Sequence, residues 1–93
     1  MIEEILHHRG TLVRRMRLEP GEATRWHIDP FHRVSVVLKG DVLKVKVSPG
    51  QVDWDEPGHD VHRAMNIGEV LYEEITVFFL AHPNDVPQPG AAE

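Results

Sequence analysis

The feature that most constrains this chain is the regular spacing of its turn signals. Clusters containing proline or glycine interrupt it about every eight to twelve residues, and short runs rich in valine, isoleucine and leucine lie between them. Proline presets φ and glycine permits a positive φ, so each cluster favours the end of a strand and a turn. No segment shows a sustained helical periodicity. The pattern predicts an all-β sandwich or barrel.

The alternation of apolar and polar residues places the individual strands. Thr11–Leu18 puts Leu12, Met16 and Leu18 on one face, which is the pattern of a half-buried strand. In the segment 42–47 the same alternation predicts that Val45 faces inward. The other expected strands are 23–28, 34–39, 42–47, 51–54, 61–67 and 70–80, and Ile2–His8 is either a short strand or a turn of helix.

Length and composition bound the organisation. Ninety-three residues correspond to one domain, which we expect to span residues 1–82. Residues 83–93 are rich in proline and small side chains, so we expect a flexible C-terminal tail. A core of this size is modest. Phe78 and Phe79 point to opposite sides of their strand, which leaves one ring outside and predicts a homodimer.

Several classes of partner are disfavoured. The chain has no cysteine, which excludes disulfides and thiolate metal sites. A net charge of −5 argues against nucleic acid and anionic membrane surfaces. No apolar run has the length of a membrane span, and the first residues lack the features of a signal peptide, so the expected location is the cytoplasm.

Two polar clusters, 21–40 and 57–66, contain the candidate metal-binding residues. His27 and Asp29 are two residues apart on an expected strand, so their side chains share a face. His62, from another strand, would complete a set of two histidines and one carboxylate. His32 is a second candidate, because a bulge after the turn at Pro30 could aim it inward. Such a set suits Fe(II), with Mn(II), Ni(II) or Zn(II) as competitors.

The spacing of the first cluster resembles that of a known family. Gly21 is followed after five residues by His27, after one more by Asp29, after three more by Arg33 and after six more by Gly40. This frame is similar to the first motif of the cupins, which are small double-stranded β-helix or jelly-roll barrels. That motif has a second histidine at the position of Asp29 and a glutamate at the position of Arg33.

The second cluster extends the resemblance. Pro57, His62 and Asn66 match the end of the second cupin motif, while its glycine stands one place early, as Gly58. The two motifs and their link cover about half of the chain. The resemblance implies a cupin double-stranded β-helix with His27 and His62 as metal ligands, and it also suggests a dimer.

The departures from the motif leave two alternatives open. Arg33 would repel a dication unless a carboxylate lies between them, so a metal-free barrel, in which Arg33 pairs with Asp29 or with an inward Glu74, stands beside the metal site. Arg33 could also hold a small anionic ligand through two parallel hydrogen bonds. With Glu74 and with Trp26 as an aromatic wall, it makes up the predicted ligand-binding set.

Two classes of function follow. One is a metal-dependent enzyme acting on a small anionic substrate, with oxygenase, isomerase and lyase chemistry all compatible with the barrel. The other is a binding or sensor module that holds a small ligand without turnover. The sequence does not choose between them.

Overall fold

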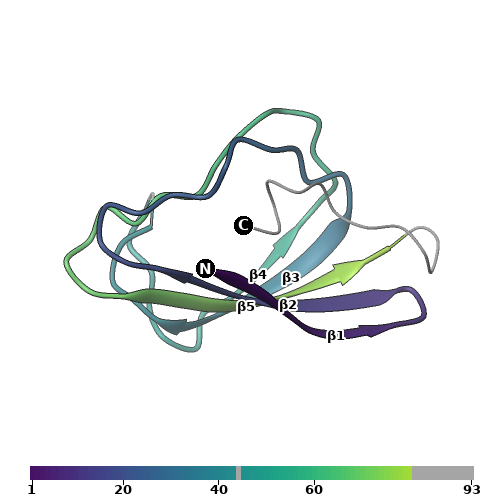
Figure 1. Cartoon of the computed structure of the whole chain (residues 1–93), viewed down its shortest axis with the longest axis horizontal. Coiled ribbons are helices and arrows are strands. Elements are labelled where there is room, and N and C mark those ends of the chain that lie inside the picture. The colour runs from purple at the N-terminus through teal and green to yellow at the C-terminus, as the bar shows by residue number, and fades with distance from the viewer. Residues whose placement is uncertain (44, 81–93) are drawn as a thin grey trace.

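The computed structural model, which describes residues 1–43 and 45–80, contains one five-stranded antiparallel sheet with a second wall facing it (Figure 1). The strand order in the sheet is β1-β2-β5-β3-β4, so the last strand of the chain lies at its centre. The strands are β1 Ile2–His8, β2 Thr11–Leu18, β3 His32–Lys39, β4 Val52–Asp55 and β5 Tyr72–Phe79.

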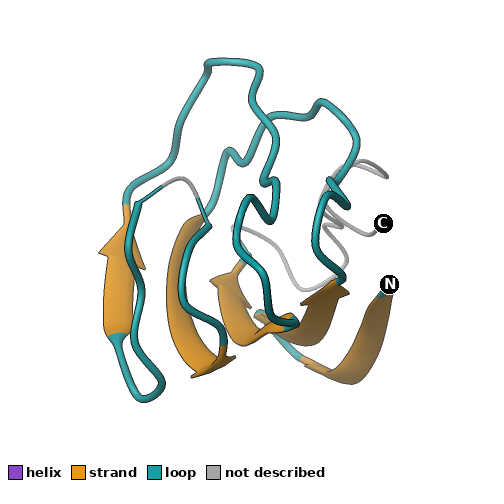
Figure 2. Cartoon of the chain, turned by 90° about the vertical axis from the view of Figure 1, so that its left-hand side faces the viewer, coloured by secondary structure: helices purple, strands orange, loops and turns teal. Residues whose placement is uncertain are grey.

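The second wall is built from two extended segments, 21–29 and 58–66, which run antiparallel above the sheet (Figure 2). Isolated bridges join Ala23 to Met65 and His27 to His62. The backbone N–H of Thr24 also donates to the carbonyl of Ala64 at 2.8 Å. The two walls together enclose the interior, which is the arrangement of a small β-barrel.

The structure confirms the all-β class and corrects several strand boundaries. Ile2–His8 is a strand and not a turn of helix. The predicted strands 23–28, 42–47 and 61–67 were wrong as regular strands, because they form isolated bridges and a few further backbone hydrogen bonds but no continuous ladder. In 42–47 the chain turns back on itself through a bridge between Val42 and Lys46, and Val45 is 69% exposed, contrary to the inward orientation expected from alternation.

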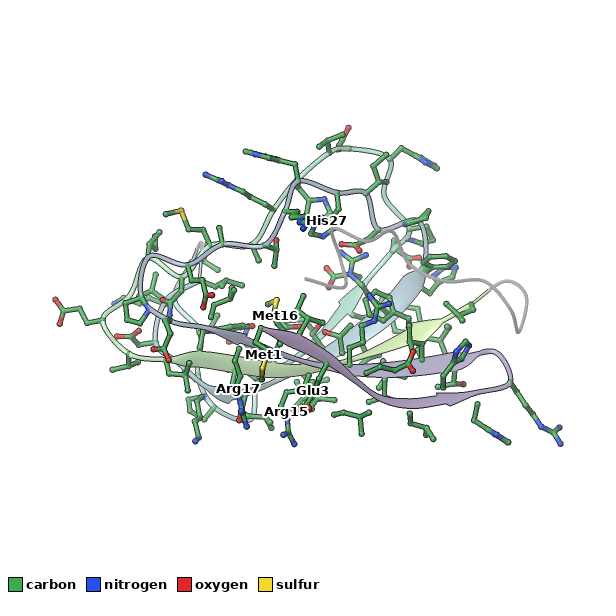
Figure 3. The ribbon with its side chains drawn as sticks, in the orientation of Figure 1. Met1, Glu3, Arg15, Met16, Arg17 and His27 are labelled. Atoms are coloured by element: carbon green, nitrogen blue, oxygen red, sulfur yellow. The ribbon has the colours of Figure 1, made fainter. Side chains whose placement is uncertain are left out.

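The register of the sheet sorts its residues into an inner and an outer face. Figure 3 shows Met16 on the side of the sheet that faces the second wall, and Arg15 and Arg17 on the opposite side. The inner face carries two apolar clusters, one at each end of the strands. One cluster contains Leu12, Phe78 and Leu80, and the other contains Leu18, Val37 and Tyr72.

Between these apolar clusters the inner face is polar. Direct cross-strand pairing places Arg14 opposite Thr76, and Thr76 opposite Ser35. The hydroxyl oxygens of Ser35 and Thr76 are 3.1 Å apart and share a hydrogen bond. Each of these strands therefore brings its polar inward residue to the same level of the barrel.

The outer face leaves aromatic side chains exposed. Phe78 is buried, whereas Phe79 is 42% exposed, which confirms that the two rings point to opposite sides. The ring of Phe79 lies 5.8 Å from that of Trp54, which is also exposed. The homodimer stays a prediction.

Two of the motif residues have structural roles. Asn66 is fully buried, and its amide donates to the carbonyls of Leu18 and Val70, at 2.8 Å each, and accepts from the N–H of Gly68. Gly40 has a φ of +131°, and a Cβ there would meet the ring of Tyr72 at 2.8 Å. Asn66 thus joins the second wall to the sheet, and Gly40 lets the chain that leaves β3 pack closely against Tyr72.

Among residues 1–43 and 45–80, no helix is long and apolar enough to cross a bilayer. The predicted flexible tail, 83–93, lies outside the described residues.

Candidate metal centre

A backbone bridge brings the two motif histidines together. His27 and His62 exchange both of their backbone hydrogen bonds, each 2.8 Å long. Residues that pair directly across two strands project to the same face. Their imidazole centroids are accordingly 4.7 Å apart, on the wall that faces the sheet. Figure 3 labels His27 on this wall.

Asp29 joins the pair as its third member. Its Oδ2 lies 3.1 Å from Nε2 of His27 and 2.9 Å from Nε2 of His62. Asp29 and His27 are buried, and His62 is half-buried. The other oxygen of Asp29, Oδ1, is buried and has no hydrogen-bond partner among the described residues. The three side chains form a compact cluster of potential metal ligands.

The second ring nitrogen of each histidine identifies its tautomer. Nδ1 of His27 lies 2.6 Å from the carbonyl of Arg25, and Nδ1 of His62 lies 3.1 Å from the carbonyl of Asp60. A carbonyl oxygen only accepts hydrogen bonds, so both Nδ1 atoms carry the proton. In a neutral imidazole this leaves a lone pair on Nε2, which is the tautomer that metal-binding histidines adopt.

The cluster could hold a divalent transition metal ion. With neutral rings, two Nε2 lone pairs face a carboxylate oxygen, and only a cation or a shared proton makes that arrangement favourable. Ligand atoms about 2.1 Å from one ion and at right angles to each other are about 3.0 Å apart. The observed Nε2–Oδ2 separations of 3.1 and 2.9 Å match this spacing. A set of two imidazoles and one carboxylate suits Fe, Mn, Ni or Zn.

Arg33 approaches the same carboxylate. Its Nη2 lies 3.7 Å from Oδ2 of Asp29, and its Nε lies 3.9 Å from Oδ2 of Asp55. Arg33 also donates a long hydrogen bond, 3.5 Å, to the backbone carbonyl of Asp29. Asp29 is therefore shared between the histidines and the guanidinium, which is the arrangement that the sequence raised as one alternative.

A cavity of about 160 Å³ lies between the cluster and the sheet. His27, Asp29, His62 and Arg33 line it, and the polar side chains of the inner sheet face line it from the opposite side. A larger adjoining cavity of about 400 Å³ shares part of this lining, including His62 and Glu74. The cluster of potential metal ligands thus borders a space that can hold a small molecule.

Glu74 faces this cavity from the central strand. The hydroxyl of Tyr72 donates to its Oε1 at 2.9 Å, and the hydroxyl of Thr76 donates to its Oε2. Glu74 is therefore held by two neutral donors and not by an arginine. Its neighbour Glu73 points to the outer face and pairs with Arg17, which confirms that the two glutamates face opposite ways.

Burial shifts two pKa values along the inner face. Desolvation lowers the pKa of Arg14, although the nearby charges of Glu4 and Asp29 oppose this shift. Desolvation also raises the pKa of the Tyr72 hydroxyl, and the charge of Glu74 adds to the effect. Both shifts reflect a polar interior that is largely shielded from water.

Two predicted site residues lie elsewhere. His32 begins β3 on the outer face, where it is exposed, pairs with Glu56 at 2.9 Å and lies against Trp54. It is remote from the cluster because strand alternation turns it away from the neighbouring Arg33. Trp26 is 62% exposed, with the guanidinium of Arg63 4.7 Å from its ring, and it does not wall the cavity.

One cavity residue was missed at the sequence level. Arg14 is only 6% exposed and lines the cavity from β2. The signal was present, because Arg14 lies midway between Leu12 and Met16 on the face that alternation had assigned to the interior. A long cationic side chain next to a second arginine, Arg15, is easily interpreted as a surface residue.

No family model and no curated protein matches the chain, but solved structures do. A cupin domain from Bordetella pertussis superposes with a TM-score of 0.75 at 19% identity, over 87% of this chain and 93% of that one. An RmlC-like cupin family protein from Methanocaldococcus jannaschii gives 0.72 at 18% identity, over 89% and 81%. An oxalate oxidase in complex with the substrate analogue glycolate gives 0.62 at 23% identity, over 86% of this chain and 47% of that one.

These likenesses agree with the observed architecture and with the spacing of the two motifs. At such low sequence identities, the likenesses show which fold this chain has, and they do not identify its activity. The chain is a small domain with the cupin double-stranded β-helix fold.

Proposed function

We propose that this chain binds one divalent transition metal ion through His27, Asp29 and His62 and holds a small anionic molecule in the adjoining cavity. The reaction class that this arrangement serves best is metal-dependent chemistry on a small organic acid, of the oxygenase, isomerase or lyase type. The cluster, the cavity and the fold support this proposal.

One observation carries the proposal. The Nε2 atoms of both histidines converge on one oxygen of Asp29, while both Nδ1–H groups donate to backbone carbonyls. A hydrogen bond from the second ring nitrogen fixes the orientation of the imidazole. Metal-binding histidines are usually oriented in this way. Two neutral rings would direct both lone pairs at one carboxylate, and a bound cation makes that arrangement favourable; in the metal-free alternative the rings would donate protons to Asp29 instead.

The roles of the residues follow from their positions. His27, Asp29 and His62 would hold the metal, and the exposed edge of His62 and the adjoining cavity leave its open positions accessible. A bound metal would polarise an oxygen atom of the ligand or activate dioxygen. Glu74, with its two hydroxyl donors, is positioned on the opposite side of the cavity to orient a ligand hydroxyl or water.

The anionic ligand is supported by the guanidinium groups of the cavity, whose lining also contains the carboxylates of Asp29, Asp55 and Glu74. Two guanidinium groups, Arg14 and Arg33, line it, and a guanidinium is the side chain best suited to a carboxylate. The oxalate oxidase with which this chain shares its fold is described with glycolate, a small carboxylate. A small organic acid is therefore the ligand class that we propose.

Metal stoichiometry tests the proposal. The protein is purified without chelators, and samples are dialysed against Fe(II) without oxygen, Ni(II) or Zn(II), after which metal is measured by mass spectrometry. We expect about one ion per chain. His62→Asn should reduce loading by more than tenfold, because a metal ligand is lost while the backbone bridge to His27 is retained.

His32→Ala is the matched control. It removes an exposed histidine on the outer face that the sequence alone could not separate from the ligands. This variant should load as much metal as the wild type. Loading well below one ion per chain under all three conditions would exclude the metal site, and equal losses in both variants would exclude this ligand set.

The alternative is a metal-free binding module, and the position of Arg33 favours it. A guanidinium 3.7 Å from Asp29 already balances part of the carboxylate charge without a metal. In that case Arg33 and the histidines form a hydrogen-bonded network, and the cavity holds a ligand without turnover. Absence of metal binding, together with retained ligand binding, would select this alternative.

A further inference from the structure

Arg14 is a buried charge that forms no ion pair with the residues that the structure describes, although the charges of Glu4 and Asp29 act on it from a greater distance. It lies at the middle of β2, is 6% exposed and lines the cavity opposite the metal cluster. No carboxylate of the described residues forms an ion pair with it within 4.0 Å, and its Nη1 is buried with no hydrogen-bond partner among those residues. The one aromatic contact is the ring of Phe78, 5.6 Å from the guanidinium carbon. A buried guanidinium in this state costs stability unless something pairs with it.

The nearby carboxylates are engaged elsewhere. Asp29 is bound by the two histidines and approached by Arg33, and Glu74 accepts hydrogen bonds from Tyr72 and Thr76. Glu4, which pairs with Arg14 in register on β1, is exposed. Arg14 is thus held at the cavity wall with at least one hydrogen-bond donor, Nη1, unpaired among the described residues.

We infer that Arg14 is the carboxylate-binding residue of the cavity, and that its ligand is a short-chain organic acid of about six non-hydrogen atoms. The acid group pairs with the guanidinium of Arg14, and the other end of the molecule extends toward His27 and His62. This inference deepens the function proposed above and rests on its ligand-binding cavity. It does not depend on a metal being bound.

The volume beside Arg14 indicates the size of a ligand that fits there without entering the adjoining cavity of about 400 Å³. A dry engineered cavity of about 150 Å³ accepts benzene, which has six non-hydrogen atoms. The space of about 160 Å³ beside Arg14 is close to that volume. Its walls add hydroxyls on Ser35, Thr24 and Thr76, which suit a hydroxyl or carbonyl oxygen on the acid. A hydroxy acid or oxo acid of three carbons has this size and these groups.

Arg14 and Arg33 differ in how far their charges are already paired within the protein, and so in how readily each can bind a ligand. Arg33 has Asp29 and Asp55 within 4.0 Å and hydrogen-bonds a backbone carbonyl, so part of its charge is already balanced. Arg14 has no ion pair within that distance among the residues described. The carboxylate of a ligand therefore gains more from pairing with Arg14, because it satisfies a group that is otherwise buried and unpaired.

The test compares lactate with lactamide, a neutral molecule of the same shape, on protein treated with EDTA, so that no metal contributes to binding. Dissociation constants are obtained by NMR titration. The wild type should bind lactate at least about tenfold more tightly than lactamide, because a charge-assisted pair is lost in the amide. Arg14→Met, which keeps much of the side-chain volume, should abolish this preference.

Two further variants separate binding from folding. Arg14→Lys keeps the charge but cannot make two parallel hydrogen bonds, so it should retain only part of the preference. Arg15→Met is the matched control, because Arg15 lies on the outer face of the same strand and pairs with Glu3 at 3.1 Å. It should keep the full preference for lactate.

The stability of the ligand-free protein supplies an independent readout. Removal of an unpaired buried charge should leave the melting temperature of Arg14→Met unchanged or higher. A lower melting temperature in Arg14→Met would assign the residue to packing and overturn the inference. An equal preference for lactate in Arg14→Met and in the wild type would overturn it as well.

Metal stoichiometry of untreated samples, measured alongside, distinguishes this inference from the metal proposal. If metal binds but lactate is not preferred, the inference on Arg14 fails and the metal site stands. If lactate binds through Arg14 and no metal binds, the metal site fails and the inference stands.

Discussion

The two walls of the barrel enclose one cavity but are constructed differently. The wall β1-β2-β5-β3-β4 is a continuous antiparallel ladder, whereas the facing wall, 21–29 and 58–66, has isolated bridges and a few further backbone bonds. The regular wall supplies Arg14, Glu74 and Thr76, and the irregular wall supplies His27, Asp29 and His62. In this barrel the cluster proposed to bind a metal thus lies on the wall that has the fewest hydrogen bonds.

The difference shows what each kind of structure contributes. In the sheet, a side chain's direction follows from its position in the strand, because neighbouring strands enforce the alternation. On the irregular wall, direction depends on a small number of contacts, such as the bridge between His27 and His62. The contacts that join the two walls should therefore be the most sensitive to substitution.

Among these contacts between the walls, we expect substitution of Asn66 to have the largest effect on stability. Asn66 is fully buried and connects the irregular wall to the carbonyl of Leu18 at the end of β2. Asn66→Ala leaves the buried carbonyl of Leu18, the partly buried carbonyl of Val70 and the N–H of Gly68 without their partner, and we expect it to lower the free energy of unfolding by about 4 kcal/mol. Urea denaturation followed by circular dichroism measures this loss.

Thr24→Val is the comparison for Asn66. Its hydroxyl accepts a single hydrogen bond within the irregular wall, from the N–H of Ala64 at 2.9 Å. The expected loss is about 1 kcal/mol. Similar losses of unfolding free energy in both variants would show that the contact between the walls contributes no more to stability than a hydrogen bond within one wall.

Gly40 offers a second test, at the end of β3. Gly40→Ala forces an L-residue to a φ of +131° and puts its Cβ 2.8 Å from the ring of Tyr72, so we expect a loss of about 3 kcal/mol. Gly50 also has a positive φ, of +89°, but nothing lies within 4 Å of its Cβ position. Gly50→Ala should therefore lose only about 1 kcal/mol, from backbone strain. Equal losses on urea denaturation would show that contact with the core does not matter at Gly40.

The smallest expected effect concerns pH at the inner face of the sheet. Burial and the charge of Glu74 raise the pKa of Tyr72 above its ordinary value of 10.0. The folded protein keeps the phenol proton that the unfolded chain releases, so this contribution to stability is complete below pH 10 and is lost as the pH rises above it.

Tyr72 is the only tyrosine of the chain, so its ionisation is followed directly by ultraviolet absorbance. The absorbance should change only as the protein unfolds in alkali. Tyr72→Phe should cost about 1 kcal/mol at neutral pH, from the lost bond to Glu74, and its stability should fall less steeply above pH 10 than that of the wild type. A titration midpoint near 10 in the folded protein would contradict the buried position.

Much of the fold was predictable from the sequence because it depends on local patterns. Alternation in 11–18 and the turns at Gly21, Gly40 and Gly50 indicated an all-β barrel, and the spacing of His27 and His62 indicated the cupin fold. The strands predicted at 23–28, 42–47 and 61–67 were less well defined, because a β-prone run becomes a strand only if a partner completes its ladder. That partner is a property of the whole fold.

The site was predictable to a different degree. His27 and Asp29 were grouped from their spacing, and His62 was added as a partner from another strand that the cupin resemblance favoured; the structure brings these three together. His32 could not be separated from them, because the orientation of a residue next to a turn depends on where the strand begins. Here β3 begins at His32 itself, so alternation directs Arg33 inward and His32 outward.

The sequence by itself determined the all-β class, the positions of the main turns and the residues from which a metal cluster could be built. Each of these depends on side-chain chemistry and on short-range periodicity. Only the tertiary structure decided that Asp29 lies between the two histidines, that Trp26 faces outward and that Arg14 faces the cavity without an ion pair among the residues described. These facts depend on pairings between segments far apart in the chain, because burial and the absence of an ion pair are properties of the space around a residue and not of its neighbours in sequence.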